Sequence, residues 1–320
     1  MTLDIYIVMV VVSRELNRFA DSLQLNDIVE FAQSSWNKFH FSDVENLRLS
    51  LKSDITKSQP FSLLRLGDGE GNVLLWGNRR NDYPELSELC MKKIWILMFG
   101  YWSENPSNWD DIAKDMSQAI VNAKYLGLHP PLRLKKFLDK ASNVEEVESL
   151  DHRGCAGLFG VWDHMQTRNG FSASDLVVTD CWIHAKIIDF YCDLISAAGN
   201  ISLITCYEGL IELLFKRTGV SHGENFLIPP QAANVKGKPE GLHYPDRFIQ
   251  ISGQLSGADL SGRLFFVAAG LLGKIYCDQI RQSGGMAIDF GSMADVLMGQ
   301  GVRRYQNAQF VSQYRLSKAP

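Results

Sequence analysis

The chain has 320 residues, 46% of them hydrophobic, with a formal net charge of −4 and an isoelectric point near 6.0. This content suffices for a large buried core in one big domain or two joined ones, and the acidic balance argues against a nucleic-acid-binding protein. Six cysteines without C-x-x-C spacing argue against a disulfide framework or zinc site and predict reduced core residues of a cytoplasmic protein.

The first apolar run, Ile5 to Val12, is too short to span a bilayer and lacks the basic residues that precede a signal peptide's apolar region. We expect a buried strand or a loosely ordered start there. Localisation is then expected to be cytoplasmic, with at most peripheral contact at the inner face of the membrane. Apolar residues at helical spacing over 14–57 predict an N-terminal helical extension, residues 1–57, that packs on a second domain, residues 58–320.

Beyond the extension, strands and helices alternate along the chain. Strands separated by helices indicate βαβ units, so the predicted fold class is α/β, a Rossmann-like, mostly parallel sheet with flanking helices. Strands are expected at 61–66, 125–128, 176–179, 201–205, 226–228, 264–268 and 286–289. Helices are expected from 73, over 84–102, 109–123 and most of 131–170, then at 183–198, 208–216 and 271–282.

Two carboxylates follow the first of these strands, in the run Gly67-Asp68-Gly69-Glu70-Gly71. Ligands bind at the carboxyl ends of strands in α/β sheets, and glycines let the backbone approach them closely. Paired carboxylates there suit a divalent cation, Mn²⁺ or Mg²⁺, that bridges to substrate phosphates; an ordinary turn is the alternative. We expect both side chains on a solvent-facing turn, so replacing either by alanine should cost at most about 1–2 kcal/mol of stability.

The string Arg65-Leu66-Gly67-Asp68-Gly69-Glu70 resembles the signature of the GT-D glycosyltransferases, which are named for an Asp-x-Glu motif after the first core strand. A second stretch is similar to that family's last βαβ unit: a strand, a small-residue turn, a helix, and a strand that ends in Asp-x-Gly, here Asp289 and Gly291. In that family the residue after Glu is often bulky, whereas here it is Gly71. The start of the following helix is therefore expected to differ.

The resemblance implies a GT-D type fold and a glycosyltransferase that moves a hexosyl group from a nucleotide-sugar donor to a glycan or lipid-linked acceptor, in surface polysaccharide or glycoconjugate synthesis. A metal ion held by carboxylates would neutralise the nucleotide diphosphate as it leaves. Asp68 and Glu70 are the expected metal ligands and catalytic residues, and Arg65 either supports them or pairs with phosphate. A non-catalytic nucleotide- or glycan-binding module and a metal-dependent phosphoester hydrolase are the alternatives.

Further donor contacts are expected from glycines and from basic or amide side chains. Gly270 and Lys274 do not form a P-loop, because the spacing is wrong and Ile275 follows the lysine. A helix N-terminus there could still receive a phosphate, although the glycine equally suits tight helix–sheet packing. The loop 229–245 is long enough to be functional or mobile, and we expect it to close over the donor. The expected donor-binding residues are Arg65, Gly67, Gly69, Gly270, Lys274, Gln231 and His243.

Transfer with inversion also needs a general base for the acceptor hydroxyl. Asp180, Glu208 and His243 are the candidates, in falling order, and the first two complete the expected catalytic set. Asp180 equally suits a helix N-cap, and Glu208 equally suits the first turn of a helix. His129 lies at another strand end and could contact ligand, whereas His184 is expected to be structural.

Overall fold

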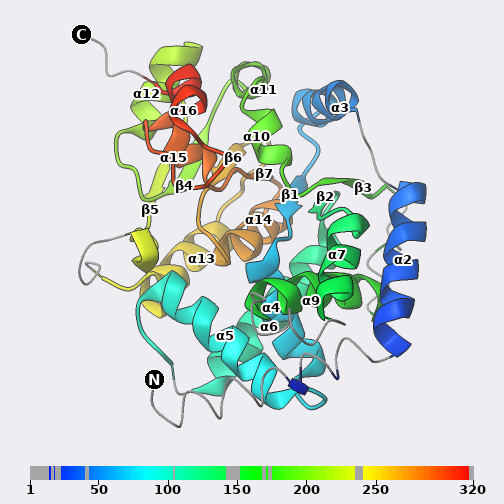
Figure 1. Cartoon of the computed structure of the whole chain (residues 1–320). Helices are drawn as coiled ribbons and strands as arrows, with labels where there is room; N and C mark the ends of the chain where they lie inside the picture. Colours follow the sequence, from blue (N-terminus) through cyan, green and yellow to red (C-terminus); the bar gives the residue numbers. More distant parts are fainter. Residues whose placement is uncertain are drawn as a thin grey trace.

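The computed structural model describes residues 14, 15, 18, 23–39, 43–103, 105–141, 152–167, 171, 175–234 and 241–316. Its centre is a seven-stranded sheet in the order β3-β2-β1-β7-β6-β4-β5, in which every neighbouring pair is parallel (Figure 1). The predicted α/β class with flanking helices is confirmed. The strands are β1 (Phe61–Arg65), β2 (Tyr125–Leu128), β3 (Val177–Asp180), β4 (Ser202–Thr205), β5 (Asn225–Leu227), β6 (Leu264–Val267) and β7 (Met286–Asp289).

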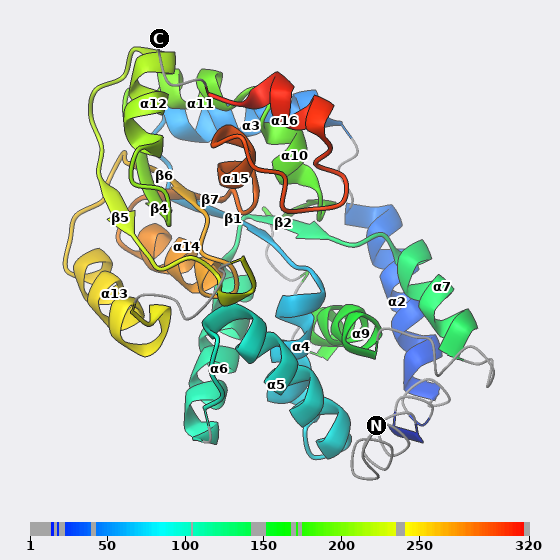
Figure 2. The same cartoon turned by 60° about the vertical axis from the view of Figure 1, so that its left-hand side comes forward.

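Helices cover both faces of the sheet, and each face has its own apolar core (Figure 2). One core contains residues of α2 (Leu23–Phe39), α4 (Asp68–Arg79), α5 (Pro84–Phe99), α6 (Pro106–Asn122), α7 (Pro131–Ala141), α9 (His152–Thr167), α13 (Phe248–Ser256) and α14 (Leu272–Gln282). The opposite core contains residues of α3 (Val44–Thr56), α10 (Ile183–Ile187), α11 (Tyr191–Ala198), α12 (Leu210–Thr218) and α15 (Met293–Leu297), with α16 (Ala308–Tyr314) packed against it. Among the described residues, no helix combines the length and apolarity needed to cross a membrane.

The order of the strands reverses at the centre of the sheet, between β1 and β7, and again between β6 and β4. From β1 the chain steps outward to β2 and β3, then crosses to β4 and β5 and returns through β6 to β7. Strand β7 therefore lies beside β1, with Phe61 opposite Met286 and Leu63 opposite Ile288. Helix α4 leaves β1 toward one face, and α15 leaves β7 toward the other (Figure 2). Such a reversal is where open α/β sheets bind ligands, at the carboxyl ends of the strands.

The central strands are buried on both faces, which explains their nearly continuous apolar sequence. All four residues of β7 are buried, and one of them, Asp289, is charged. A buried carboxylate needs compensating partners. We therefore expect charged or hydrogen-bonding groups around Asp289, at the carboxyl end of β7.

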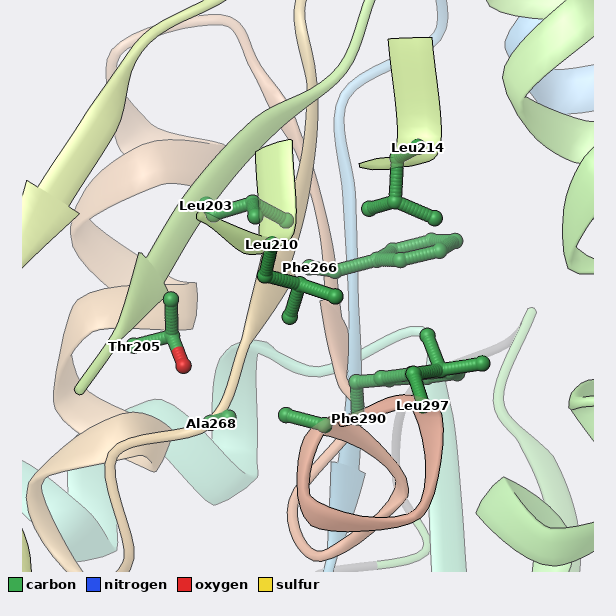
Figure 3. A pocket seen from close by; sticks show the side chains of 9 residues that line it. Leu203, Thr205, Leu210, Leu214, Phe266, Ala268, Phe290 and Leu297 are labelled. Atoms are coloured by element: carbon green, nitrogen blue, oxygen red, sulfur yellow. The ribbon is translucent and has the colours of Figure 1, made fainter. Parts of the chain in front are cut away.

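A small cavity of about 10 Å³ lies on the α12–α15 face of the sheet (Figure 3). The stacked rings of Phe266 and Phe290 line it, with centroids 4.7 Å apart. The other lining residues are Leu203, Thr205, Leu210, Leu214, Ala268, Ala294 and Leu297. Because the space is no larger than one water and almost wholly apolar, it is a packing void and not a ligand site.

Several boundaries differ from those expected. Helix α4 begins at Asp68 instead of near residue 73, and the helix expected over 183–198 is divided by a turn into α10 and α11. Helix α13 was not predicted. The two helices α2 and α3 of the extension are present, and α3 buries Leu47, Leu51 and Ile55. The run Ile5 to Val12 lies outside the described residues.

Candidate functional site

Four charged side chains meet at the reversal between β1 and β7. The ammonium of Lys274, in the first turn of α14, lies 2.7 Å from Oε1 of Glu70 and 2.8 Å from Oδ2 of Asp289. Arg65 and Asp289 end β1 and β7, and Glu70 lies in the first turn of α4. We call these four residues the central charge network.

Arg65 binds the far side of the same carboxylate. Its Nη2 donates to Oδ1 of Asp289 at 3.1 Å, and its Nε donates to the carbonyl oxygen of that residue at 3.1 Å. Gly291 makes room for this contact: its φ is +50°, and a Cβ there would lie 2.1 Å from Nη2 of Arg65. The Asp-x-Gly ending of β7 thus has a physical reason, since a side chain at Gly291 would push the guanidinium away.

The network is electrically balanced and buried, with Lys274 at 3% and Asp289 at 2% side-chain exposure. Burial acts to raise the pKa of Asp289, but Arg65 and Lys274 outweigh it, so that pKa is lowered. Burial acts to lower the pKa of Lys274, but Asp289 and Glu70 outweigh it, so that pKa is raised. The opposite charges around Lys274 and Asp289 therefore hold these two groups in their charged forms.

The two carboxylates of the Asp-x-Glu motif face different neighbours. Glu70 accepts a hydrogen bond from the backbone N–H of Gly67 at 2.8 Å and pairs with Lys274, which leaves it 12% exposed. Asp68, 37% exposed, pairs instead with Nη1 of Arg153 on α9 at 2.6 Å. Residues two apart on an α-helix point about 200° away from each other. Both residues belong to the first turn of α4 instead of a solvent-facing turn; Asp68 is partly exposed, whereas Glu70 is largely buried.

This geometry also bears on the expected metal ion. Asp68 and Glu70 do not converge on one point, and Lys274 already supplies a cation to Glu70. Within the described part of the chain, no group of three or more His, Cys, Asp or Glu side chains is arranged to hold a metal. The residues present do not fit a cation shared by the two motif carboxylates, and the divalent cofactor stays a prediction.

Helix α9 packs unusually close to the motif. The Cα of Gly157 lies so near the backbone of Asp68 that a Cβ on it would be 2.1 Å from the Asp68 carbonyl oxygen. Gly71 contacts the same glycine from the next turn of α4. The glycine at position 71 therefore has a cause in this chain, because α9 occupies the space that a bulky side chain would need.

A cluster of rings extends the network toward the neighbouring strands. Nη1 of Arg65 lies 3.1 Å from Nδ1 of His184, whose Nε2 lies 2.9 Å from the hydroxyl of Tyr305. Burial, then the nearby Arg65, Lys274 and Arg303, lower the pKa of His184 well below its usual value. His184 is therefore a neutral partner of Arg65, consistent with the structural role expected for it.

Three of the expected donor-binding residues do come together. Gly270 has a φ of +58°, and a Cβ there would lie 2.7 Å from the side-chain nitrogen of Gln231. Lys274 is 3.3 Å from the Gly270 carbonyl oxygen. However, Lys274 is turned toward Glu70 and Asp289 and is too buried to reach a ligand in this arrangement. Gly67 and Gly69 lie at the start of α4, beside the central charge network.

His243 belongs to a different environment. Its Nε2 lies 3.2 Å from the hydroxyl of Tyr276, and its ring packs against Phe99 and Tyr276. Burial and Arg247 lower its pKa to about 3, so it is neutral and packed as a core side chain. Residues 235–240 of the loop expected to close over the donor lie outside the described residues.

The two carboxylates expected as general bases lie at different distances from the network. Asp180 ends β3, two strands from β1, with Lys186 3.3 Å from its Oδ2. Glu208 is exposed in the turn before α12, after β4, which is three strands from β1. With neighbouring strands about 4.8 Å apart, those separations are roughly 10 and 14 Å. Asp180 is the nearer of the two.

Comparison of the chain with protein-family models, with curated proteins and with solved structures finds no match. The case for a function therefore rests on the residues of this chain and on their geometry.

Proposed function

We propose that this protein is a glycosyltransferase that takes a hexosyl group from a nucleotide-sugar donor and passes it to a glycan or lipid-linked acceptor. The observation that supports this best is the central charge network, which lies at the reversal of a parallel sheet, where ligands bind in this class of fold. The proposed setting is surface polysaccharide or glycoconjugate synthesis in the cytoplasm, at most in contact with the membrane.

In this proposal the donor diphosphate lies at the N-terminus of α4. The first N–H groups of a helix lack intrahelical partners, and with the helix dipole they favour an anion. Gly67 and Gly69 add no side chains of their own at that end of the helix, whose first turn also holds Asp68 and Glu70. Arg153, which is paired with Asp68 at the rim, supplies a cation that can turn toward phosphate. The central charge network then holds the first turn of α4 in place, so its four members act as positioning residues.

Asp68 and Asp180 are the side chains proposed to act on the substrates. Asp68 is the half-exposed carboxylate of the motif, so it is the one that can face the donor sugar or its phosphates. Asp180 is the proposed general base for the acceptor hydroxyl, because it lies nearer to β1 than Glu208 does. His243 is not proposed as a base, since its ring is packed against Tyr276.

A non-catalytic nucleotide-binding module is the second candidate, favoured by one observation. Both motif carboxylates are already engaged by protein cations in the resting arrangement, as expected of groups that only maintain a binding surface. The two candidates differ in one respect, because a binding module holds a nucleotide sugar without cleaving it.

The test is a thermal-shift screen of UDP, GDP, ADP, CDP and dTDP, and of their hexose derivatives, with Mn²⁺ and with EDTA. A ligand at 100 times its Kd stabilises the folded state by about 2.7 kcal/mol, so specific binding is easily seen. Release of nucleotide from the best donor is then measured for wild type, Asp68→Asn and the control Asp27→Asn, an exposed carboxylate on α2.

Loss of release in Asp68→Asn alone supports the transferase. Binding without release in wild type supports the module. No stabilisation by any nucleotide contradicts both. A response that persists in EDTA shows that binding needs no divalent cation.

A further inference from the structure

One large aromatic side chain is presented to solvent at the carboxyl edge of the sheet. Trp182 lies two residues after the end of β3 and is 42% exposed. Among the described tryptophans it is the one in the exposed group. An exposed indole forgoes the free energy that burial of its apolar surface would provide. Its neighbours therefore indicate what could cover it.

Three rings hold the indole in place. Tyr305 and His129 meet it edge-on, with centroids at 5.2 and 5.7 Å and interplanar angles of 72° and 69°. His184 stacks on it in an offset arrangement, at 6.3 Å and 28°. With these three contacts in place Trp182 stays 42% exposed, and this exposed area is available to another planar group.

The two histidine rings beside the indole are uncharged, and a charged side chain lies next to them. Burial, then Arg133 and Arg65, lower the pKa of His129 to about 3, so this histidine is neutral, as His184 is. Beside these rings, Nη1 of Arg133 lies 3.1 Å from Nδ1 of His129. An apolar π surface with hydrogen-bonding groups beside it suits a heteroaromatic ring.

The position of Trp182 relative to the charge network points to the kind of ring. Strands β1, β2 and β3 have the spatial order 3-2-1, as in the mononucleotide-binding half of a Rossmann fold. A diphosphate at the β1–β7 reversal would extend its nucleoside over this half. His184 contacts both Arg65 and Trp182 and so links the two ends of that path.

We propose that Trp182, held by His129, His184 and Tyr305, is the stacking platform for the nucleobase of the donor. This inference rests on the proposed function, because it assumes that a nucleoside diphosphate binds at the central charge network. It adds a binding residue that no sequence motif indicates.

The test compares nucleoside diphosphates with inorganic pyrophosphate, which has no base. Binding of UDP, GDP, ADP, CDP, dTDP and pyrophosphate is measured by titration calorimetry for wild type, Trp182→Phe, Trp182→Ala and the control Ile249→Ala. Ile249 is 64% exposed on α13. Acrylamide quenching of wild-type tryptophan fluorescence, with and without nucleotide, follows Trp182 without any substitution.

We expect Trp182→Ala to weaken binding of the preferred nucleoside diphosphate by roughly 5- to 150-fold and to leave pyrophosphate binding unchanged. The nucleotide affinity of Trp182→Phe should lie between those of wild type and Trp182→Ala. Bound nucleotide should reduce quenching in wild type. Equal nucleotide affinity in wild type and Trp182→Ala, or unchanged quenching, overturns the platform and leaves the proposed function standing. An equal loss of pyrophosphate affinity in Trp182→Ala overturns it as well. Failure of wild type to bind any nucleoside diphosphate overturns both proposals.

Discussion

Gly71 of α4 and Gly157 of α9 touch backbone to backbone: a Cβ added to Gly71 would lie 1.6 Å from the carbonyl oxygen of Gly157. Two helices can approach this closely only where neither has a side chain. The contact places Arg153, one turn earlier on α9, within 2.6 Å of Asp68. Gly71 therefore allows α9 to come close enough for Arg153 to pair with Asp68.

Gly71→Ala should destabilise the protein, because neither backbone can move away without disturbing α9. We expect a loss of roughly 1–3 kcal/mol or more in the free energy of unfolding, measured by urea denaturation. Gly253→Ala on α13 is the matched control, since a Cβ there meets nothing within 4 Å. That control should be neutral or stabilising by up to about 1 kcal/mol. Equal effects of the two substitutions would show that the close contact is absent.

Lys274→Met should be costly, because it removes the cation between two carboxylates. Breaking a buried ion pair by deleting one partner typically costs about 3–5 kcal/mol. The double variant with Asp289→Asn should recover part of the loss. Lys186→Met, which removes a partner of Asp180 from a partly exposed pair, should cost no more than about 1 kcal/mol. A Lys274→Met protein as stable as wild type would contradict the described network.

Stability should fall in mild acid through the buried neutral histidines. His129 is 4% exposed, and its pKa is lowered to about 3. Below pH 6.5 the unfolded chain binds a proton there that the folded protein does not, so stability is lost as the pH falls from 6.5 toward 3. The loss per histidine is about 1.4 kcal/mol per pH unit. His129→Gln should therefore flatten the decline of unfolding free energy between pH 6.5 and 4.5. An unchanged slope would mean that His129 is protonated in the folded protein.

All six cysteines are thiols in the structure, and four of them are buried. Burial raises the pKa of Cys181 to about 12 and that of Cys206 to about 11. In a native thiol titration at pH 8, Cys192 should therefore react first and the buried thiols slowly. Denaturation without reductant should expose all six. Fewer than four under those conditions would contradict the reduced state.

Local pattern predicted much of the fold. The bounds of β2 and β7 were predicted to the residue, because apolar runs between turn residues define buried strands. The start of α4 was placed too late, since Gly69 and Gly71 lower helix propensity and conceal the pattern. The missed signal is the cap: Glu70 stands at the third helical position and accepts from the N–H of Gly67.

The partners of the motif could not be predicted from spacing. Arg65 and Asp289 were both recognised at strand ends, but 224 residues separate them, and strand order alone brings them together. The direction of each motif carboxylate depends on where the helix begins. Trp182 and Tyr305 belong to no motif, and their contact is a product of tertiary packing.

The insertion of β7 between β1 and β6 has a consequence for how the chain reaches its native state. Until residues 286–289 dock, β1 and β6 each expose an unpaired edge at the centre of the future sheet, and Arg65 is without its carboxylate. Contacts between residues this distant in sequence form slowly, and open strand edges invite association with other chains. The strand that completes the central charge network is thus also the one that closes the sheet, so a growing chain acquires its protection from aggregation and this network in one late step.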